Sequence, residues 1–225
     1  MKADATLAQC RWGVLLLLPV LASWYLGLRH VGTDIHQGEV YRILYLHVPA
    51  CLTAFMCAFY LLIVSIIGLR RKQESSLYWG RAIAELGLMF TVLGLITGSI
   101  WGRVTWGVWW TWDARILTTF ILGVLYAAYL FLQASLPQGR NKIIASSVLG
   151  CLIFVDIPII YQSVVWWRTL HQRSSLAAGT MSSEISQVLY FAIGAMLLLM
   201  TWMWVARVEN IRMHEKIKTL ARRIS

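Results

Sequence analysis

Residues 44–69 read LYLHVPACLTAFMCAFYLLIVSIIGL, an apolar run without a single lysine, arginine, aspartate or glutamate. A helix crosses the hydrocarbon core of a bilayer with about 20 residues, so this run predicts a transmembrane helix. Five further apolar stretches of sufficient length flank it, at about 12–28, 80–100, 116–136, 143–163 and 187–206. The sequence therefore predicts an all-α integral membrane protein with six transmembrane helices, formed by residues 1–225 as one membrane domain.

The composition agrees with a membrane protein. Hydrophobic residues make up 59% of the 225 residues and charged residues only 13%, values outside the range of soluble globular domains. The net charge of +10 is expected to report topology, because the chain lacks the basic-aromatic pattern of a nucleic-acid-binding domain. No P-loop is present, which excludes nucleotide hydrolysis by this chain. Membrane lipid is thus an expected partner, and nucleic acid is not.

The lysines and arginines predict the orientation. With the six predicted spans, fourteen of them fall on the side of the two termini and six on the other side. Basic residues accumulate in cytoplasmic segments, so both termini are predicted to be cytoplasmic. Three segments then face outward, at about 29–43, 101–115 and 164–186.

The second outward segment is exceptionally rich in tryptophan. Residues 101–115 read WGRVTWGVWWTWDAR, with Trp101, Trp106, Trp109, Trp110 and Trp112. Trp106, Trp109, Trp110 and Asp113 have the spacing of one helical face, which predicts a short amphipathic helix on the outer surface. Tryptophans also form ordinary belts at membrane interfaces. Two more tryptophans in the third outward segment favour a platform for a flat apolar ligand over a belt.

Histidines and arginines accompany these tryptophans on the outward side. His47 lies at the mouth of the second span and His171 in the third outward segment, while His30 and His36 could compete with them as ligands. Arginine forks match carboxylates, although arginines also flank helix ends and meet phospholipid head groups. Five of the six outward arginines are candidates for this role: Arg42, Arg103, Arg115, Arg168 and Arg173.

Haem fits this residue set well. It is planar and apolar, carries two propionates, and its iron accepts axial histidines. His47 and His171 are predicted to hold the iron of a non-covalently bound, b-type haem, since no CxxCH motif for covalent attachment occurs. The remaining predicted haem contacts are Trp101, Trp106, Trp109, Trp110, Trp112, Asp113, Arg42, Arg103, Arg115 and Arg168. Asp113 could instead pair with a neighbouring arginine, and Asp156, a carboxylate inside a span, is a further functional candidate.

The tryptophan-rich run resembles the signature of the haem-handling membrane proteins of cytochrome c biogenesis. Six spans, YLHVP around His47, DIPI at 156–159 and WWRTLH ending at His171 are similar to the cytochrome c maturation protein C family of system I, also called heme exporter protein C. The resemblance covers nearly the whole chain. By motif match it implies His47 and His171 as axial ligands and 101–113 as the haem-holding segment.

The resemblance implies a haem-transfer scaffold in the bacterial inner membrane, with its site facing the periplasm. Such a scaffold delivers haem to a periplasmic haem chaperone, alongside an ATP-binding-cassette pair and a small single-span subunit. It supplies proximity and orientation, consistent with the lack of a nucleophile-base pair. Three other functions remain open on the residues alone. They are a transporter subunit that moves haem or a solute across the membrane, a membrane b-type cytochrome for electron transfer, and a structural membrane subunit whose tryptophans only anchor it.

Overall fold

The computed structural model describes residues 2–34, 37–171, 179 and 181–224. Of residues 2–12 and 222–224 it describes the backbone only. Nearly all of these residues are helical, and an isolated bridge between Asp34 and Gly38 is the sole β pairing among them. The elements are α1 (Lys2–Arg29), the 3-10 helix η1 (Glu39–Ile43), α2 (Leu44–Arg71), α3 (Ser75–Trp106), α4 (Ala114–Ser135), α5 (Arg140–Trp166) and α7 (Ser183–Ile224).

Each of the six predicted spans lies on one of the six long helices. Five of these helices are long and apolar enough to cross a membrane, and the apolar part of α1, Gly13–Arg29, is a shorter sixth candidate. The prediction of an all-helical, multi-pass membrane fold is confirmed.

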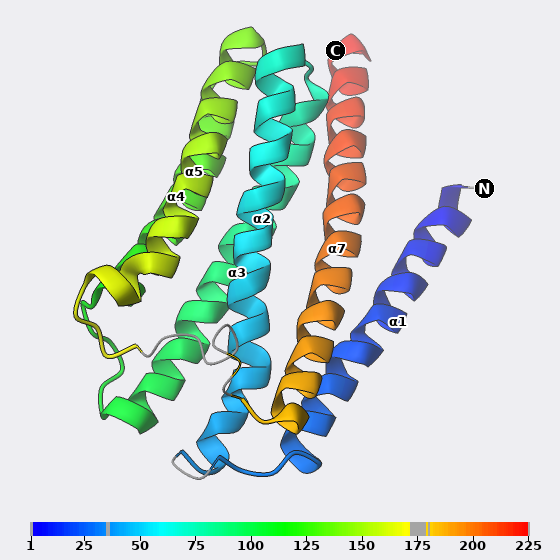
Figure 1. Ribbon diagram of the computed structural model, residues 1–225. Helices are drawn as coiled ribbons and strands as arrows, with labels where there is room; N and C mark the ends of the chain where they lie inside the picture. Colours follow the sequence, from blue (N-terminus) through cyan, green and yellow to red (C-terminus); the bar gives the residue numbers. More distant parts are fainter. Residues whose placement is uncertain (1, 35–36, 172–178, 180, 225) are drawn as a thin grey trace.

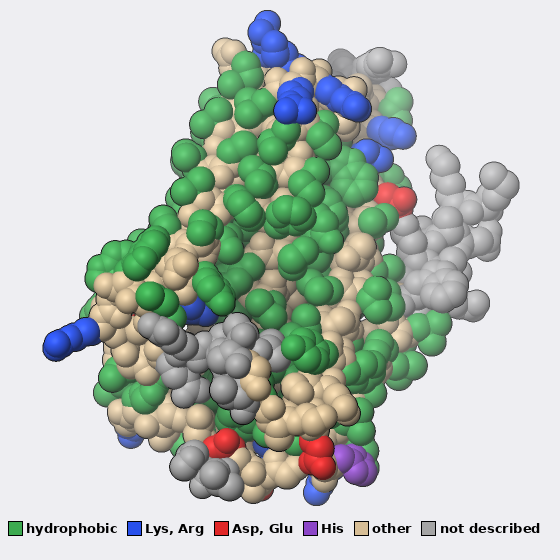
Figure 2. Space-filling view, in the orientation of Figure 1, with side chains coloured by type: hydrophobic (Ala, Val, Ile, Leu, Met, Phe, Trp, Pro, Cys, Tyr) green, Lys and Arg blue, Asp and Glu red, His purple; other side chains and the backbone are tan. Residues whose placement is uncertain are grey.

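The helices form an antiparallel bundle in which α2 packs chiefly against α3, α5 and α7 (Figure 1). Helix α4 packs against α3 and α5, and α1 lies on the outside, mainly against α7. Both termini lie toward the same end of the bundle, at the top of Figure 1. Lysines and arginines gather at this end in Figure 2, whereas hydrophobic side chains cover the flank. We call it the termini end and the opposite end the pocket end.

Close packing between α3 and α4 depends on a small residue. An added Cβ on Gly87 would lie 2.3 Å from the ring of Tyr126, so only glycine lets the two helices approach this closely. The Tyr126 hydroxyl donates a hydrogen bond of 2.9 Å to the Ala54 carbonyl and thereby links α4 to α2. These contacts hold α4 against α3 and α2 in the middle of the bundle.

The predicted surface helix in the tryptophan-rich run is wrong. Helix α3 extends to Trp106 and ends at Gly107, whose φ of 79° is a left-handed conformation suited to glycine. Helix α4 begins after Asp113, whose carboxylate accepts a 3.0 Å hydrogen bond from the Ile116 amide. The strong stop and start signals confine residues 107–113 to a non-helical connection, despite the helical spacing of their aromatic side chains.

Candidate functional site

Two adjoining cavities occupy the pocket end. The first, of about 220 Å³, lies among α2, α3, α4, α5 and the start of α7, and we call it the helical cavity. It reaches Cys51 and Phe55, one and two turns along α2 from His47. The second, of about 290 Å³, is bordered by Gln37, Thr105 and Leu170, and we call it the loop cavity. Both are lined by the same five residues, here termed the shared wall: His47, Gly98, Trp101, Trp106 and His171.

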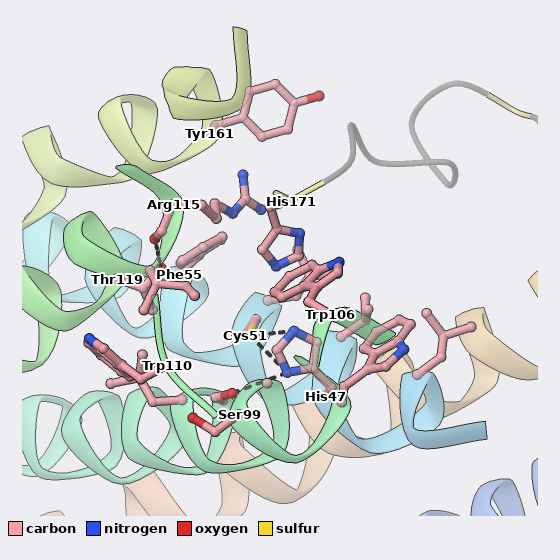
Figure 3. Close-up of a pocket in the computed structure, with 18 of the residues that line it drawn as sticks. His47, Cys51, Phe55, Ser99, Trp106, Trp110, Arg115, Thr119, Tyr161 and His171 are labelled. Atoms are coloured by element: carbon pink, nitrogen blue, oxygen red, sulfur yellow. Dashed lines mark hydrogen bonds between the residues drawn. The ribbon is translucent and has the colours of Figure 1, made fainter. Parts of the chain in front are cut away.

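His47 is held in place by α3. Figure 3 shows His47 beside α3. Its Nδ1 lies 3.1 Å from the Gly94 carbonyl oxygen and 3.1 Å from the Thr97 hydroxyl oxygen. The Thr97 hydroxyl donates its proton to the Leu93 carbonyl at 2.7 Å, so its oxygen is available to accept. We therefore assign the proton of His47 to Nδ1, which leaves the lone pair of Nε2 for a metal.

Two neighbours fix the ring of His47 further. An added Cβ on Gly98 would lie 3.0 Å from Cε1 of His47, so the absence of a side chain there makes room for the imidazole. The indole of Trp101 meets the imidazole edge to face at 5.6 Å between ring centres. Trp101 is itself anchored, because its Nε1 donates a 2.7 Å hydrogen bond to Gln37.

His171 reaches the site from the segment after α5. Its imidazole lies edge to face with Trp106 at 5.5 Å, and its backbone amide donates a 3.0 Å hydrogen bond to the Thr169 hydroxyl. Burial lowers the pKa of His171 to about 4; the positive charge of Arg115 adds to this shift and Asp113 opposes it. The imidazole is consequently neutral at pH 7, the state in which it can bind iron.

Arg115 is the one predicted arginine that the described structure places in the cavity lining. It stands in the first turn of α4, its Nη1 donates a 3.0 Å hydrogen bond to the Ile160 carbonyl in α5, and its side chain extends toward His171 in Figure 3. One guanidinium nitrogen is thus engaged with the backbone, and the others are available for a carboxylate at the cavity.

The other predicted arginines lie elsewhere. Arg42 donates to the carbonyls of Gly27 and Val31 and pairs with Glu39, so it ties η1 to the end of α1. Arg103 donates to the Gly107 carbonyl, and Arg168 is exposed on the outer surface. Arg173, like His36, falls outside the described residues.

The five clustered tryptophans separate into two groups. Trp101, Trp106 and Trp110 line the helical cavity. Trp109 and Trp112 are 60% and 73% exposed, as expected for an interfacial belt. Asp113 caps α4 and accepts a weak hydrogen bond from Thr111, so its carboxylate is engaged in the connection itself.

Several cavity residues were not predicted from the sequence. Cys51, Phe55, Ser99, Thr119 and Tyr161 all contribute to the helical cavity. Cys51 was the most accessible to prediction, because it follows His47 by four residues and therefore lies one turn below it on α2. Phe55 follows four residues later on the same face of α2. Ser99, Thr119 and Tyr161 depend on how α3, α4 and α5 meet, which no local pattern reveals.

Two further candidates lie away from the cavities. His30 is exposed and packs against Tyr25 at the end of α1. Asp156 is buried in α5, contributes to neither cavity, and its Oδ2 has no hydrogen-bond partner among the described residues.

Comparison with known proteins identifies the family. The model of the heme exporter protein C family matches residues 3–223. The chain belongs to the heme exporter protein C family. Heme exporter protein C of Escherichia coli K12 is 33% identical over 189 residues, which cover 84% of this chain and 77% of the relative. The putative cytochrome c biosynthesis ccmC-like mitochondrial protein of Arabidopsis thaliana is 35% identical over 84% of this chain and 71% of the relative.

Membership of the heme exporter protein C family implies a role in haem handling for cytochrome c biogenesis. The residues at the pocket end fit a haem as cargo. Among the described residues, no group of three or more histidine, cysteine, aspartate or glutamate side chains could hold a bare metal ion. Haem iron needs only axial protein ligands, because the macrocycle supplies the other four, so two histidines suffice.

Proposed function

We propose that this protein binds haem at the pocket end, with His47 and His171 as axial ligands, and delivers it to a periplasmic haem chaperone. The haem is cargo, held without a covalent bond as in b-type cytochromes. Trp101, Trp106 and Trp110 would pack against the macrocycle, and Arg115 would bind a propionate.

One observation carries the proposal. Residues far apart in the chain, His47 in α2 and His171 after α5, line the same two cavities together with tryptophans from α3. Both lie in aromatic surroundings, since Trp101 contacts His47 and Trp106 contacts His171. Apolar aromatic walls with a few convergent polar groups are typical of cofactor and ligand sites.

The first test is an absorption spectrum of the protein purified from haem-producing cells. We expect a bound haem with the spectrum of two histidine ligands. His47→Ala and His171→Ala should each lose haem or change the spectrum, whereas His30→Ala, at the same end of the bundle but outside both cavities, should behave as wild type. A wild-type protein without haem, or an equal loss in His30→Ala, would contradict haem binding at this site.

The second test addresses delivery. As the resemblance implies, the acceptor is a chaperone histidine that becomes bonded to a haem vinyl group, and an ATP-binding-cassette pair with a small single-span subunit acts alongside. Membranes containing this protein should produce haem-linked chaperone, and the double variant His47→Ala, His171→Ala should not. A wild-type yield of haem-linked chaperone from the double variant would contradict delivery from this site. It would not contradict haem binding, which the first test measures.

The proposed location is the bacterial inner membrane, with the pocket end in the periplasm. Its support is the gathering of basic side chains at the termini end, because such residues concentrate in cytoplasmic segments. A reporter that fluoresces only in the cytoplasm should fluoresce when fused after Ser225. A dark fusion that is stably made would reverse the orientation.

A further inference from the structure

We propose that the two histidines are unequal ligands: His47, positioned by Thr97 and the Gly94 carbonyl, stays on the iron, and His171 is the ligand that the receiving protein replaces. This inference rests on the proposed haem binding. It assigns Thr97 as a positioning residue, which acts through His47, and it defines the side from which haem leaves.

The support for His47 comes from a rigid helix pair. Its Nδ1 faces two acceptors on α3, the Gly94 carbonyl and the Thr97 hydroxyl, each at 3.1 Å. The Thr97 hydroxyl is oriented in turn by its own 2.7 Å hydrogen bond to Leu93. A hydrogen bond from the ring nitrogen that does not bind the metal fixes the imidazole and makes it a more basic ligand. Loss of such a partner typically weakens metal affinity about 10–100-fold.

His171 lacks comparable support. It stands outside the helices, and its ring nitrogens make no hydrogen bond to another of the described residues. Its imidazole contacts the Trp106 ring, and its backbone amide donates a hydrogen bond to the Thr169 hydroxyl. Loop segments open locally at lower free energy than helix interiors, so dissociation of His171 requires less rearrangement than dissociation of His47.

Ligand replacement balances simply. The coordinate bond between iron and Nε2 or Nδ1 of His171 breaks, and a bond from iron to a donor of the receiving protein forms. No electron moves and the iron keeps its oxidation state. His171 leaves as a neutral imidazole, and no proton is taken up or released.

The test compares two threonine variants, one beside each histidine. Carbon monoxide binds reduced, haem-loaded protein only after one histidine has left, so the rate of the spectral change reports that departure. Thr169→Ala removes a support of His171 and should accelerate binding about tenfold, equivalent to ~1.4 kcal/mol on the barrier. Thr97→Val leaves His171 untouched and should bind carbon monoxide at the wild-type rate.

Thr97→Val should instead change properties that depend on His47. A less basic axial ligand stabilises ferric haem less, so the reduction potential should rise. The affinity for haem should fall about tenfold or more. Thr97→Ser retains a hydroxyl and should restore both values, which a merely structural role of the Thr97 side chain would not require.

The outcomes separate this inference from the proposed function. A wild-type protein without haem refutes the function itself. Haem that is bound with normal spectra, but with carbon monoxide binding accelerated in Thr97→Val and not in Thr169→Ala, makes His47 the departing ligand and overturns the inference. Equal acceleration in both variants overturns it as well, because the ligands would then be equivalent.

Discussion

At the scale of single residues, tryptophans that are neighbours in the sequence have very different surroundings. Trp110 lines the helical cavity and contacts Trp112 and Phe120 edge to face, while Trp112 itself is largely exposed. A buried indole that borders a cavity can stack on a flat ligand, whereas an exposed one can only anchor the protein at the membrane surface.

This difference predicts the effect of substitution. Trp106→Leu with Trp110→Leu should reduce haem content several-fold, because both side chains line the cavity and leucine replaces a large aromatic face. Trp109→Leu with Trp112→Leu serves as the matched pair and should keep the wild-type haem content. Haem and protein absorbance of the purified variants measure the effect. Equal retention in both pairs would show that the tryptophans form a belt.

His171 predicts a pH dependence of stability. Burial lowers its pKa in the folded protein to about 4, below the ordinary value of about 6.5 in an unfolded chain. Between these values the unfolded chain binds a proton that the folded chain excludes, so stability is full above about pH 6.5 and declines as the pH falls toward 4. Thermal unfolding of haem-free protein from pH 7 to pH 4 should show this decline.

The matching variant is His171→Ala, in which part of the decline should disappear. His30→Ala should retain the wild-type slope, since that exposed side chain lies outside the cavities. An unchanged slope in His171→Ala would contradict burial of a neutral imidazole.

Sequence reasoning proposed more residues for the site than the structure brings together at the cavities. His47, His171 and Arg115 were predicted and are brought to one pair of cavities. Arg42 and Arg103 were assigned to the ligand because arginine suits carboxylates, yet each donates to backbone carbonyls at a helix end. Sequence alone cannot distinguish these uses, because both require the same side chain near the same boundary.

At the scale of elements, the connection between α3 and α4 positions Arg115. Gly107 ends α3, and Asp113 starts α4 two residues before the arginine. The helical spacing of Trp106, Trp109 and Trp110 suggested a separate helix, but periodicity describes only which side chains could share a face. The glycine and the aspartate decide the backbone, and they were the more informative signals in this stretch.

Removal of the cap should have a local cost. Asp113→Ala should lower the free energy of unfolding by roughly 0.5–2 kcal/mol, the usual loss of an N-cap, because the Ile116 amide loses its acceptor. Asp113→Asn can still accept this hydrogen bond and should recover most of the stability. Thermal unfolding in detergent measures both. An alanine variant as stable as wild type would show that the cap contributes nothing.

At the scale of the whole molecule, a charged cluster joins α3 to α7 away from the pocket end. Glu85 accepts hydrogen bonds from Arg207 at 2.5 and 3.1 Å and from Arg81 at 3.1 Å. Arg81 and Glu85 are four residues apart on α3, so their pairing is local to one helix. Arg207 is remote in the chain, so its participation required the packing of α7 against α3.

Loss of this cluster should weaken the bundle without affecting the cavities. Glu85→Gln should lower the free energy of unfolding by roughly 1.5–3 kcal/mol, the range for hydrogen bonds to charged groups. Haem content should remain at the wild-type level, because no cluster residue lines either cavity. Lys218→Gln, which removes a solvent-exposed pair with Glu215, is the control and should cost far less. Loss of haem in Glu85→Gln would indicate coupling between distant parts of the bundle.

The overall fold was the most predictable level, since the six apolar runs had few alternatives to six membrane-spanning helices. The cavities were the least predictable, because helices that adjoin in the chain do not specify which side chains meet at their ends. Gly94 and Gly98, for example, have the G-x-x-x-G spacing of closely packed membrane helices. That spacing does not reveal which side chain they face, whereas the structure places the Gly94 carbonyl and the space beside Gly98 next to the imidazole of His47.

The shared wall lines two cavities that are otherwise bordered by different parts of the chain. The helical cavity opens among apolar helix flanks, whereas the loop cavity is bordered by segments beyond the helix ends. Haem bound at the shared wall, as proposed, would border both cavities. Its entry and exit can then involve different residues, Cys51 and Phe55 on one side and Gln37 and Leu170 on the other.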